Sequence, residues 1–315
     1  MAHLDGRQLM RSDGRVTWGS DLRRNSSLYL MALPGLVFFF ILSYIPMGYL
    51  AVAFQDYKVA KGLFGSKFVG FQQFANLFSD YMFPTILRNT IILNLLKMFL
   101  CFAMPILLAL CFNEMRPSRG KSVVQSIVYL PHFFSWVIIY GILNSMLNTN
   151  NGLFNQVIVS LGGKAIPFLS KPGMFRPIMV LSEIWKEAGW SSIIYIAALS
   201  GISPELYEAA VIDGASRLKQ IWHVALPGIR STIVILFILS VGSLMSNSFE
   251  QVLVMKNSAV KDVAEIIPTY VYDKGIVQFK ISYATAVGLF QSIIGFVLVL
   301  FSNTLAKRMG GNSLW

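Results

Sequence analysis

Six long apolar segments constrain the fold of this chain more than any other feature of its sequence. A helix needs about 20 mainly apolar residues to cross the hydrocarbon core of a bilayer, and a backbone inside that core must satisfy its own hydrogen bonds. The segments therefore predict an all-α integral membrane protein with six transmembrane helices and both termini on one side. They cover residues 25–55, 89–112, 122–147, 177–199, 231–254 and 281–306.

The composition excludes most soluble classes. Apolar residues make up 55% of the 315 positions and charged residues only 13%, against about 45–50% and 25% in soluble domains. The net charge of +11 would suggest nucleic-acid binding in a soluble protein, but here the basic residues flank the apolar segments, as membrane anchors do. No nucleic-acid partner is expected. Cys101 and Cys111 lie in one apolar segment, which is typical of buried thiols rather than of a disulfide or metal site.

Hydrophilic ends frame the apolar part of the chain. Residues 1–24 predict a cytoplasmic tail rather than a cleaved signal peptide, because the apolar segment that follows is long enough to span. Residues 25–308 form the predicted transmembrane domain, and residues 309–315 a short C-terminal tail. Lysine and arginine number 13 on the side of the termini and 11 on the other side, so the positive-inside rule favours cytoplasmic termini by a small margin.

One polar segment, residues 203–227, separates two of the apolar segments. Ser203 is placed as an N-cap, with Pro204 in the first helical position, and Gly214 is placed to end that helix. A second short helix is expected over 215–225, until Leu226-Pro227 interrupts it. The segment predicts a helix-turn-helix that is too polar to enter the bilayer.

The same segment resembles the signature of the permease subunits of ATP-binding-cassette importers: Glu-Ala-Ala, three residues, Gly, nine residues, Ile, one residue, Leu-Pro. Here Val224 replaces the isoleucine, and the other positions match. The resemblance implies a type I importer permease in which residues 203–227 form the cytoplasmic coupling helix, which sits in a groove of a separate ATPase subunit. It places in that contact Glu208, Ala209, Ala210, Asp213 and Gly214. An amphipathic surface loop is the alternative interpretation.

Other phrases extend the resemblance over residues 25–308. N-E-M-R, Y-L-P-H-F-F-S-W, E-I-W-K-E-A-G-W and Y-A-T-A-V-G-L-F look like the carbohydrate-importer branch, and within it the permeases for oligosaccharides cut from polysaccharides, with acidic alginate-type saccharides as one candidate cargo. The resemblance implies a multi-pass protein of the bacterial inner membrane. It also implies a second homologous permease, two ATPase subunits that bind ATP and Mg, and an extracytoplasmic solute-binding protein.

Charged residues inside the apolar segments carry whatever chemistry the membrane domain has. A charge at bilayer depth costs about 2.5–3.5 kcal/mol on insertion scales, so it usually faces a bundle interior or a wet cavity. Together with Trp190, three of these charges fall on one face of the fourth helix. An aromatic ring beside alternating charges suits a saccharide path, whereas an internal Glu183–Lys186 pair that only orients helices is the alternative. The charged residues are Lys97, Glu183, Lys186, Glu187 and Glu250.

The fifth apolar segment carries Ser243, Asn247, Glu250 and Gln251 at helical spacing. The resemblance assigns this region to the translocation path, with Asn247 as the closest positional match, and hydrogen bonding between helices is the alternative. Lys97 is expected to pair with a neighbouring helix. His132 has no companion at metal-ligand spacing, so a hydrogen-bonding role is expected.

No catalytic or metal site is expected in this chain. No metal-ligand cluster or nucleophile–base pair is evident. Gly120-Lys121-Ser122 lacks the first glycine of a phosphate-binding loop, since Met115 stands in its place. The sequence thus favours a non-enzymatic permease with no cofactor of its own. An ion-coupled secondary transporter with Glu183, Glu187 and Glu250 as ion sites is the alternative class, and a peptide or lipoprotein-linked cargo is an alternative within the family.

Overall fold

The protein is described here by a computed structural model that covers residues 22–308. Residues 1–21 and 309–315 lie outside the described residues, so the two predicted tails stay predictions. The described part is mostly helical, as the sequence predicts, with one departure from an all-α fold. Strands β1 (Gln55–Asp56) and β2 (Lys67–Phe68) pair antiparallel, with Gln55 opposite Phe68 and Asp56 opposite Lys67.

The helices follow in chain order, with π and 3-10 turns marked η. The first half contains α2 (Ser26–Phe39), η2 (Phe40–Tyr44), α3 (Ile45–Met47), η3 (Gly48–Phe54), η4 (Val59–Lys61), α4 (Gly62–Gly65), α5 (Gln72–Ser79), α6 (Phe83–Glu114), α7 (Arg119–Tyr129), η5 (Leu130–Phe133), α8 (Trp136–Leu147) and α9 (Leu153–Ser160). The second half contains α10 (Pro172–Ser200), α11 (Pro204–Ile212), α12 (Arg217–Gln220), η6 (Ile221–Ala225), α13 (Leu226–Gly228), α14 (Arg230–Gly242), α15 (Phe249–Met255), η7 (Ser258–Val260), α16 (Lys261–Ala264), α17 (Ile267–Tyr272), η8 (Asp273–Val277) and α18 (Ile281–Arg308).

Three helical stretches of the described chain are long and apolar enough to cross a membrane: Ser26–Phe54, Phe83–Glu114 and Ile281–Leu305. Two bent pairs become candidates if each pair counts as one span. Arg119–Phe133 meets Trp136–Leu147 at 104°, and Arg217–Gly228 meets Arg230–Gly242 at 62°. The 29-residue helix α10 carries three charges near its middle.

The third predicted segment is not one uninterrupted helix. Pro131 lies in the 3-10 turn η5, and the chain leaves the helical conformation at Phe134, which is extended with a ψ of 137°. Ser135 then caps a new helix, since its hydroxyl accepts from the Ile138 N–H at 3.4 Å. The predicted span over 122–147 is therefore bent and not one straight helix, and the bend lies at Phe134 and Ser135.

The fifth predicted segment is also interrupted. Helix α14 ends at Gly242, residues 243–248 form turns, and α15 begins at Phe249 after Ser248, which has a left-handed φ of 73°. Serine and asparagine side chains bond locally in these turns: Asn247 Nδ2 donates to Ser243 Oγ at 3.2 Å. Such bonds compete with the helical backbone, so the prediction of one helix over 231–254 is wrong.

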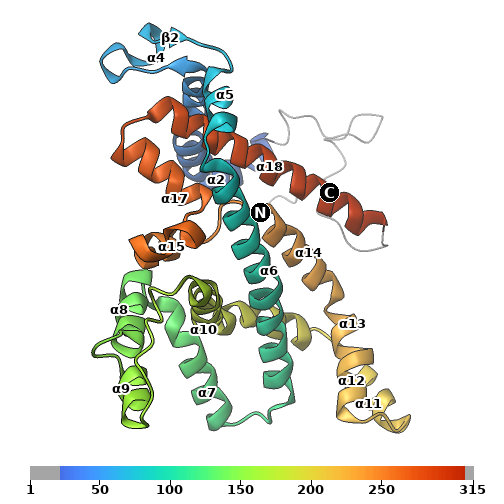
Figure 1. The fold of residues 1–315 in the computed structure, drawn as a ribbon. Coiled ribbons are helices and arrows are strands. Elements are labelled where there is room, and N and C mark those ends of the chain that lie inside the picture. The colour runs from blue at the N-terminus through green and yellow to red at the C-terminus, as the bar shows by residue number, and fades with distance from the viewer. Residues whose placement is uncertain (1–21, 309–315) are drawn as a thin grey trace.

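Helix α6 is the long central helix of the molecule (Figure 1). It contributes to three apolar clusters along its axis. Ile86 packs with α17 and α18, Leu93 packs with α10 and α15, and Ala109 packs with the end of α10 and with the helices after α11. Because Leu93 shares a cluster with Met179 and Ala109 shares one with Leu199, α6 and α10 run in the same direction.

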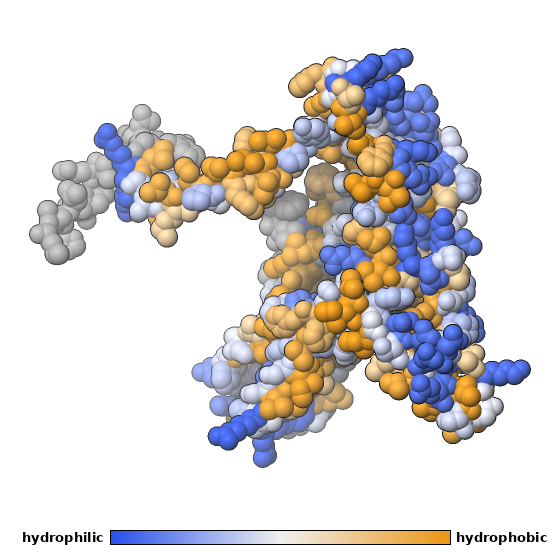
Figure 2. All heavy atoms as spheres, turned by 90° about the vertical axis from the view of Figure 1, so that its left-hand side faces the viewer, coloured by the Kyte–Doolittle hydropathy of each residue, from blue (hydrophilic) through white to orange (hydrophobic). Residues whose placement is uncertain are grey.

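The first part of the first span, helix α2, lies apart from this body, whereas its last turn, η3, contacts α18. Helix α2 has no buried residue, and Leu30 and Met31 are 71% and 79% exposed. Figure 2 shows an apolar arm that extends away from the rest of the molecule. A helix that is apolar on all sides needs lipid or another protein around it.

The two ends of the molecule differ in kind. Helices α11 and α12 lie at one end of α6, whereas strand β2 and helices α4 and α5 lie at the other (Figure 1). We call these the coupling end and the outer end.

Candidate coupling segment and translocation cavity

The polar segment folds as the sequence predicts in its first half. The Ser203 hydroxyl accepts from the Glu205 N–H at 3.3 Å, and α11 runs over Pro204–Ile212. Gly214 ends it with a φ of 75°, and Ala215 N–H donates to the Ala210 carbonyl at 2.9 Å. A Cβ at Gly214 would meet no atom within 4 Å, so the glycine is required for its backbone conformation and not for space.

The second half departs from the prediction. The helix continues past Leu226-Pro227 to Gly228, and the bend of 62° comes just before Arg230. The π turn at Ile221–Ala225 precedes the proline, and Leu226 N–H donates to the Ile221 carbonyl. This wider turn shifts the hydrogen-bond partners by one residue, which lets the helix accommodate Pro227.

The segment is attached to the body by few side chains. Tyr207 and Ile221 pack on the cluster around Ala109 and Leu199. Arg217 Nη1 pairs with Glu114 Oε2 at 3.1 Å, which joins α12 to the end of α6.

Most of α11 and the turn after it face outward, whereas Gln220 and Ala225 are buried. Glu208, Ala209, Asp213 and Gly214 are exposed, and Ala210 is half-buried. Large apolar side chains are exposed beside them: Leu206, Val211, Ile212, Leu218 and Trp222. An exposed apolar patch at a polar end is typical of a protein-binding surface.

A polar cavity of about 360 Å³ lies between α6, α10 and the break between α14 and α15. A 13-residue helix such as α14 spans about 20 Å, less than the roughly 30 Å of hydrocarbon. Irregular backbone at membrane depth is tolerated where it lines a cavity, as residues 243–248 do here. The cavity is lined by Asn94, Lys97, Met98, Cys101, Phe102, Glu183, Glu187, Ser191, Ser240, Leu244, Asn247 and Ser248.

Lys97 is the centre of one charge network in the cavity wall. Its buried ammonium pairs with Glu183 at 3.2 Å and donates to Ser248 Oγ at 2.7 Å. It also donates to Gln251 Oε1, whose amide nitrogen in turn donates to the Met179 carbonyl at 2.8 Å. The expectation that Lys97 pairs with a neighbouring helix is confirmed, and the network joins α6, α10 and α15.

A second network surrounds His132. Its Nδ1 lies 2.7 Å from Glu187 Oε2, and its ring stacks on Trp190 with centroids 4.5 Å apart. Lys186 pairs with Glu187 at 2.9 Å and donates to the His132 carbonyl at 2.6 Å. A Cβ at Gly189 would lie 2.2 Å from the Val128 carbonyl oxygen, so this glycine lets α7 approach α10 closely enough for η5 to reach Glu187.

These contacts correct the alternative of an internal Glu183–Lys186 pair. Both charges point to other partners, Glu183 to Lys97 and Lys186 to Glu187. The expected hydrogen-bonding role of His132 is confirmed. Within residues 22–308, no group of three or more His, Cys, Asp or Glu side chains is placed to hold a metal ion.

The structure brings most, but not all, of the predicted path residues together. Glu183, Glu187 and Asn247 line the same cavity, and the Ser243 hydroxyl accepts a hydrogen bond from the Asn247 amide. Lys186 and Trp190 belong to the adjacent His132 network. Glu250 is exposed at the start of α15 and does not line the cavity, because the break at 243–248 turns it away from the helical face that the sequence predicts.

Four polar residues that line the cavity are not among those that the sequence predicts for the path. Asn94, Ser191, Ser240 and Ser248 all face the cavity. Ser248 Oγ donates to Asn94 Oδ1 at 3.0 Å, while the buried Asn94 Nδ2 has no acceptor among the described residues. Asn94 lies three positions before Lys97 in a helix otherwise rich in leucine, and that spacing was the available signal.

Comparisons with known proteins give consistent results. A profile of the family described as "Binding-protein-dependent transport system inner membrane component" matches residues 103–311. The polygalacturonan/rhamnogalacturonan transport system permease protein YteP of Bacillus subtilis is 46% identical over 91% of this chain and 90% of its own length. Protein LplB of the same organism is 43% identical over 95% of this chain and 94% of its own length.

A chain of a solved bacterial alginate ABC transporter has a similar fold. That transporter was crystallised in complex with a periplasmic protein carrying an alginate pentasaccharide. The match has a TM-score of 0.86 and 37% sequence identity, and it covers 94% of this chain and 99% of the other.

Proposed function

Because this chain belongs to the family of inner membrane components of binding-protein-dependent transport systems, we propose that it is a permease subunit of an ATP-driven oligosaccharide importer. We further propose that its cargo is cut from an acidic polysaccharide. The chain forms part of the path through the membrane, and separate subunits hydrolyse ATP.

The agreement of two full-length matches carries this proposal. One relative is named for polygalacturonan transport, and the solved neighbour imports the acidic polysaccharide alginate. That relative is named for rhamnogalacturonan as well. Polygalacturonan and alginate are polymers of uronic acids and rhamnogalacturonan contains galacturonic acid, so all three carry carboxylates. A match over nine-tenths of both chains supports a common role, although fold alone would not.

The exposed side of α11 is the proposed contact with an ATPase subunit. Glu208, Asp213 and the apolar patch around Ile212 project from the coupling end, where they are free to bind another protein. Two such ATPases, which bind ATP and Mg, and an extracytoplasmic solute-binding protein complete the proposed importer. The apolar arm formed by α2 offers a surface for a second, homologous permease.

Six spans and cytoplasmic termini form the proposed topology. The three single stretches and the first bent pair supply four candidates, α14 from the second pair supplies a fifth, and α10 supplies the sixth. Its charges face partners on α6 and η5 rather than lipid, which supports a membrane position for this helix. The coupling end then lies in the cytoplasm of a bacterial cell and the outer end outside the inner membrane.

The central cavity is the proposed saccharide path of this subunit. Its carboxylates are paired with Lys97 and Lys186, Glu187 also contacts the His132 ring, and most of the other polar lining groups are hydroxyls and amides. Such groups suit the hydroxyls of a sugar. Because Glu183 and Glu187 already have partners, they fit a saccharide path better than the alternative of a coupled-ion site.

A reconstituted importer tests the cargo. Purified complexes are given the solute-binding protein with oligogalacturonate, oligoalginate or neutral maltooligosaccharides, and ATP hydrolysis is measured. We expect stimulation by acidic oligosaccharides and little by neutral ones. Equal stimulation by neutral saccharides would contradict the proposal of an acidic cargo. Stimulation by peptides alone would contradict the proposal of a saccharide cargo.

A further inference from the structure

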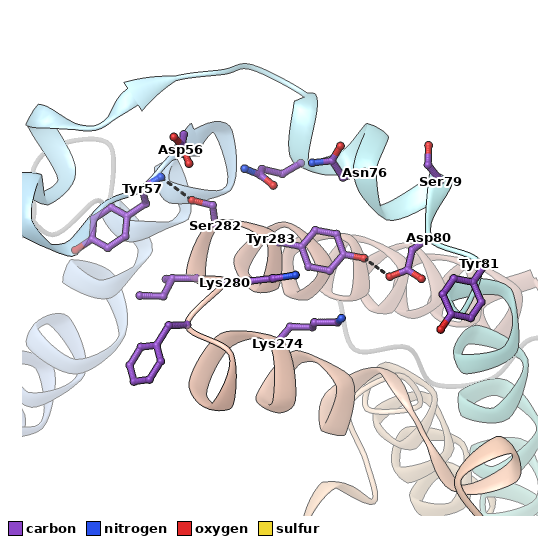
Figure 3. Close-up of a pocket in the computed structure, with 13 residues that line it drawn as sticks. Asp56, Tyr57, Asn76, Ser79, Asp80, Tyr81, Lys274, Lys280, Ser282 and Tyr283 are labelled. Atoms are coloured by element: carbon purple, nitrogen blue, oxygen red, sulfur yellow. Dashed lines mark hydrogen bonds between the residues drawn. The ribbon is translucent and has the colours of Figure 1, made fainter.

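A second pocket of about 620 Å³ opens at the outer end, away from the central cavity. It is built from segments far apart in the sequence: residues 56–81 contribute one side, and residues 274–283 contribute the other (Figure 3). The Tyr57 N–H donates to Ser282 Oγ at 2.8 Å, which joins the end of β1 to the first turn of α18. The pocket is therefore held by long-range contacts and is not a loose fold of one loop.

Asp80 lines this pocket and is held in place by three hydrogen bonds. Its carboxylate accepts hydrogen bonds from the Tyr270 hydroxyl, from the Tyr283 hydroxyl at 3.2 Å and from the Met82 N–H at 2.9 Å. Burial would raise the pKa of Asp80, but these donors and the nearby Lys274 outweigh it and hold the pKa below its usual value. The carboxylate is thus charged and engaged by neutral donors within the protein.

Two lysines, Lys274 and Lys280, line the pocket together with the carboxylates of Asp56 and Asp80. Within the described residues, neither Lys274 nor Lys280 forms an ion pair, and Lys274 only lies over the Tyr270 ring, 5.2 Å from its centre. The contrast is Lys256 in the same outer region, which pairs with Glu265 at 3.2 Å and Asp273 at 2.7 Å. Of the two carboxylates that line the pocket, Asp80 is held by the two tyrosine hydroxyls, and the exposed Asp56 lies 4.0 Å from Lys58.

The backbone brings these two lysines together. Lys280 N–H donates to the Lys274 carbonyl at 2.8 Å, and Phe279 between them takes a left-handed φ of 55°. A non-glycine residue in that conformation is uncommon and tends to occur where function requires it. Figure 3 shows both ammonium groups directed toward the same space beside Tyr283 and Asp80.

The other lining groups suit a sugar. Tyr81 is 88% exposed at the rim, beside Asp80 in Figure 3, and an exposed ring covers the C–H face of a pyranose. The Asn76 amide and the Ser79 hydroxyl lie on the opposite side of the pocket from the lysines and can bond sugar hydroxyls. A neutral sugar would offer no carboxylate to Lys274 and Lys280, neither of which forms an ion pair among the described residues.

We propose that this outer pocket is a saccharide subsite, in which Lys274 and Lys280 bind the carboxylate of a uronic-acid unit while Tyr81 covers its sugar face. The inference rests on the proposed acidic cargo and adds a place where this chain itself recognises the acid. In this arrangement the outer pocket selects a negatively charged cargo. The central cavity, whose carboxylates are paired with lysines, then conducts it.

Binding of trigalacturonate and of its neutral counterpart, galactotriose, to the assembled transporter in nanodiscs tests the subsite. Calorimetry without the solute-binding protein compares wild type with the Lys274→Gln/Lys280→Gln double variant. Each lost charge-assisted hydrogen bond should weaken the binding of trigalacturonate about tenfold or more. The binding of galactotriose should not change. Lys280→Arg should retain most of the affinity. Lys61→Gln, which removes an exposed outer lysine that does not line the pocket, should bind as wild type.

Unchanged trigalacturonate binding by the double variant would overturn the subsite, as would an equal loss for both trisaccharides. A loss confined to docking of the solute-binding protein would also overturn it, because the lysines would then contact protein and not sugar. The proposed function is judged separately, by uptake through the wild-type importer. If wild type imports oligogalacturonate and the double variant does so with an unchanged KM, only the subsite fails.

Discussion

The coupling segment and the cavity wall hold their polar residues in opposite ways. In residues 203–215 the functional side chains are exposed, and backbone features such as the Ser203 cap and the left-handed Gly214 set their positions. In the cavity wall, the charged side chains of α6 and α10 hold one another and thereby hold the helices. Substitutions should therefore separate function from stability at the coupling end and affect both together in the cavity.

The largest effect is expected at Lys97. Lys97→Met leaves Glu183, Ser248 and Gln251 without their shared donor, and removing one partner of a buried pair costs about 3–5 kcal/mol. Glu183→Gln should cost less, because Lys97 keeps its bonds to Ser248 and Gln251. Thermal unfolding of the purified protein measures both.

The double variant Lys97→Met/Glu183→Gln completes this cycle. Since it leaves no unpaired charge, it should recover part of the stability lost in Lys97→Met. If the two single changes simply added, Lys97 and Glu183 would not be coupled, and the ion pair would not be what holds α6 to α10.

Coupling should fail next, with a smaller loss of stability than at Lys97. Gly214→Val forces a β-branched residue into a left-handed conformation, and we expect at least a tenfold fall in saccharide-stimulated ATP hydrolysis. Gly214→Asn, which tolerates that conformation, should retain most activity. Equal activity of the two variants would show that the conformation of residue 214 is not needed.

A smaller effect is expected at the outer end. Asp80→Asn weakens bonds from two tyrosines and should cost about 1–2 kcal/mol at neutral pH. The exposed Asp56, which pairs with Lys58 only at 4.0 Å, supplies the control Asp56→Asn with little expected change. Because the folded pKa of Asp80 lies below the reference value of 3.8, its stabilisation is present above that pH and lost as the pH falls through the folded pKa. The difference between wild type and Asp80→Asn should then disappear.

The smallest effect is expected at Glu250. Its side chain is exposed and lies outside the cavity, so Glu250→Gln should change stability by less than about 0.5 kcal/mol and leave uptake unchanged. A clear loss of uptake would show that Glu250 belongs to the saccharide path, as the sequence predicts.

The contrast between the two regions also explains what the sequence could predict. Ser203, Pro204 and Gly214 act on neighbouring backbone, so their roles follow from order along the chain, and the structure confirms the helix they frame. Lys97 pairs with Glu183 on another helix, and Lys186 reaches the His132 carbonyl in η5 as well as its neighbour Glu187. No periodicity within one helix could identify the contacts between elements. The break before Ser248 decided which residues face the cavity, and its signal was a run of serine and asparagine that helical spacing alone does not reveal.

ATP-dependent uptake tests the central proposal most directly. Proteoliposomes containing the complete importer receive labelled oligogalacturonate with the solute-binding protein on the side of the outer end, and either ATP on the side of α11 or an imposed proton or sodium gradient. The account predicts accumulation that requires ATP hydrolysis and is unaffected by the gradients. Accumulation driven by an ion gradient without ATP would contradict it.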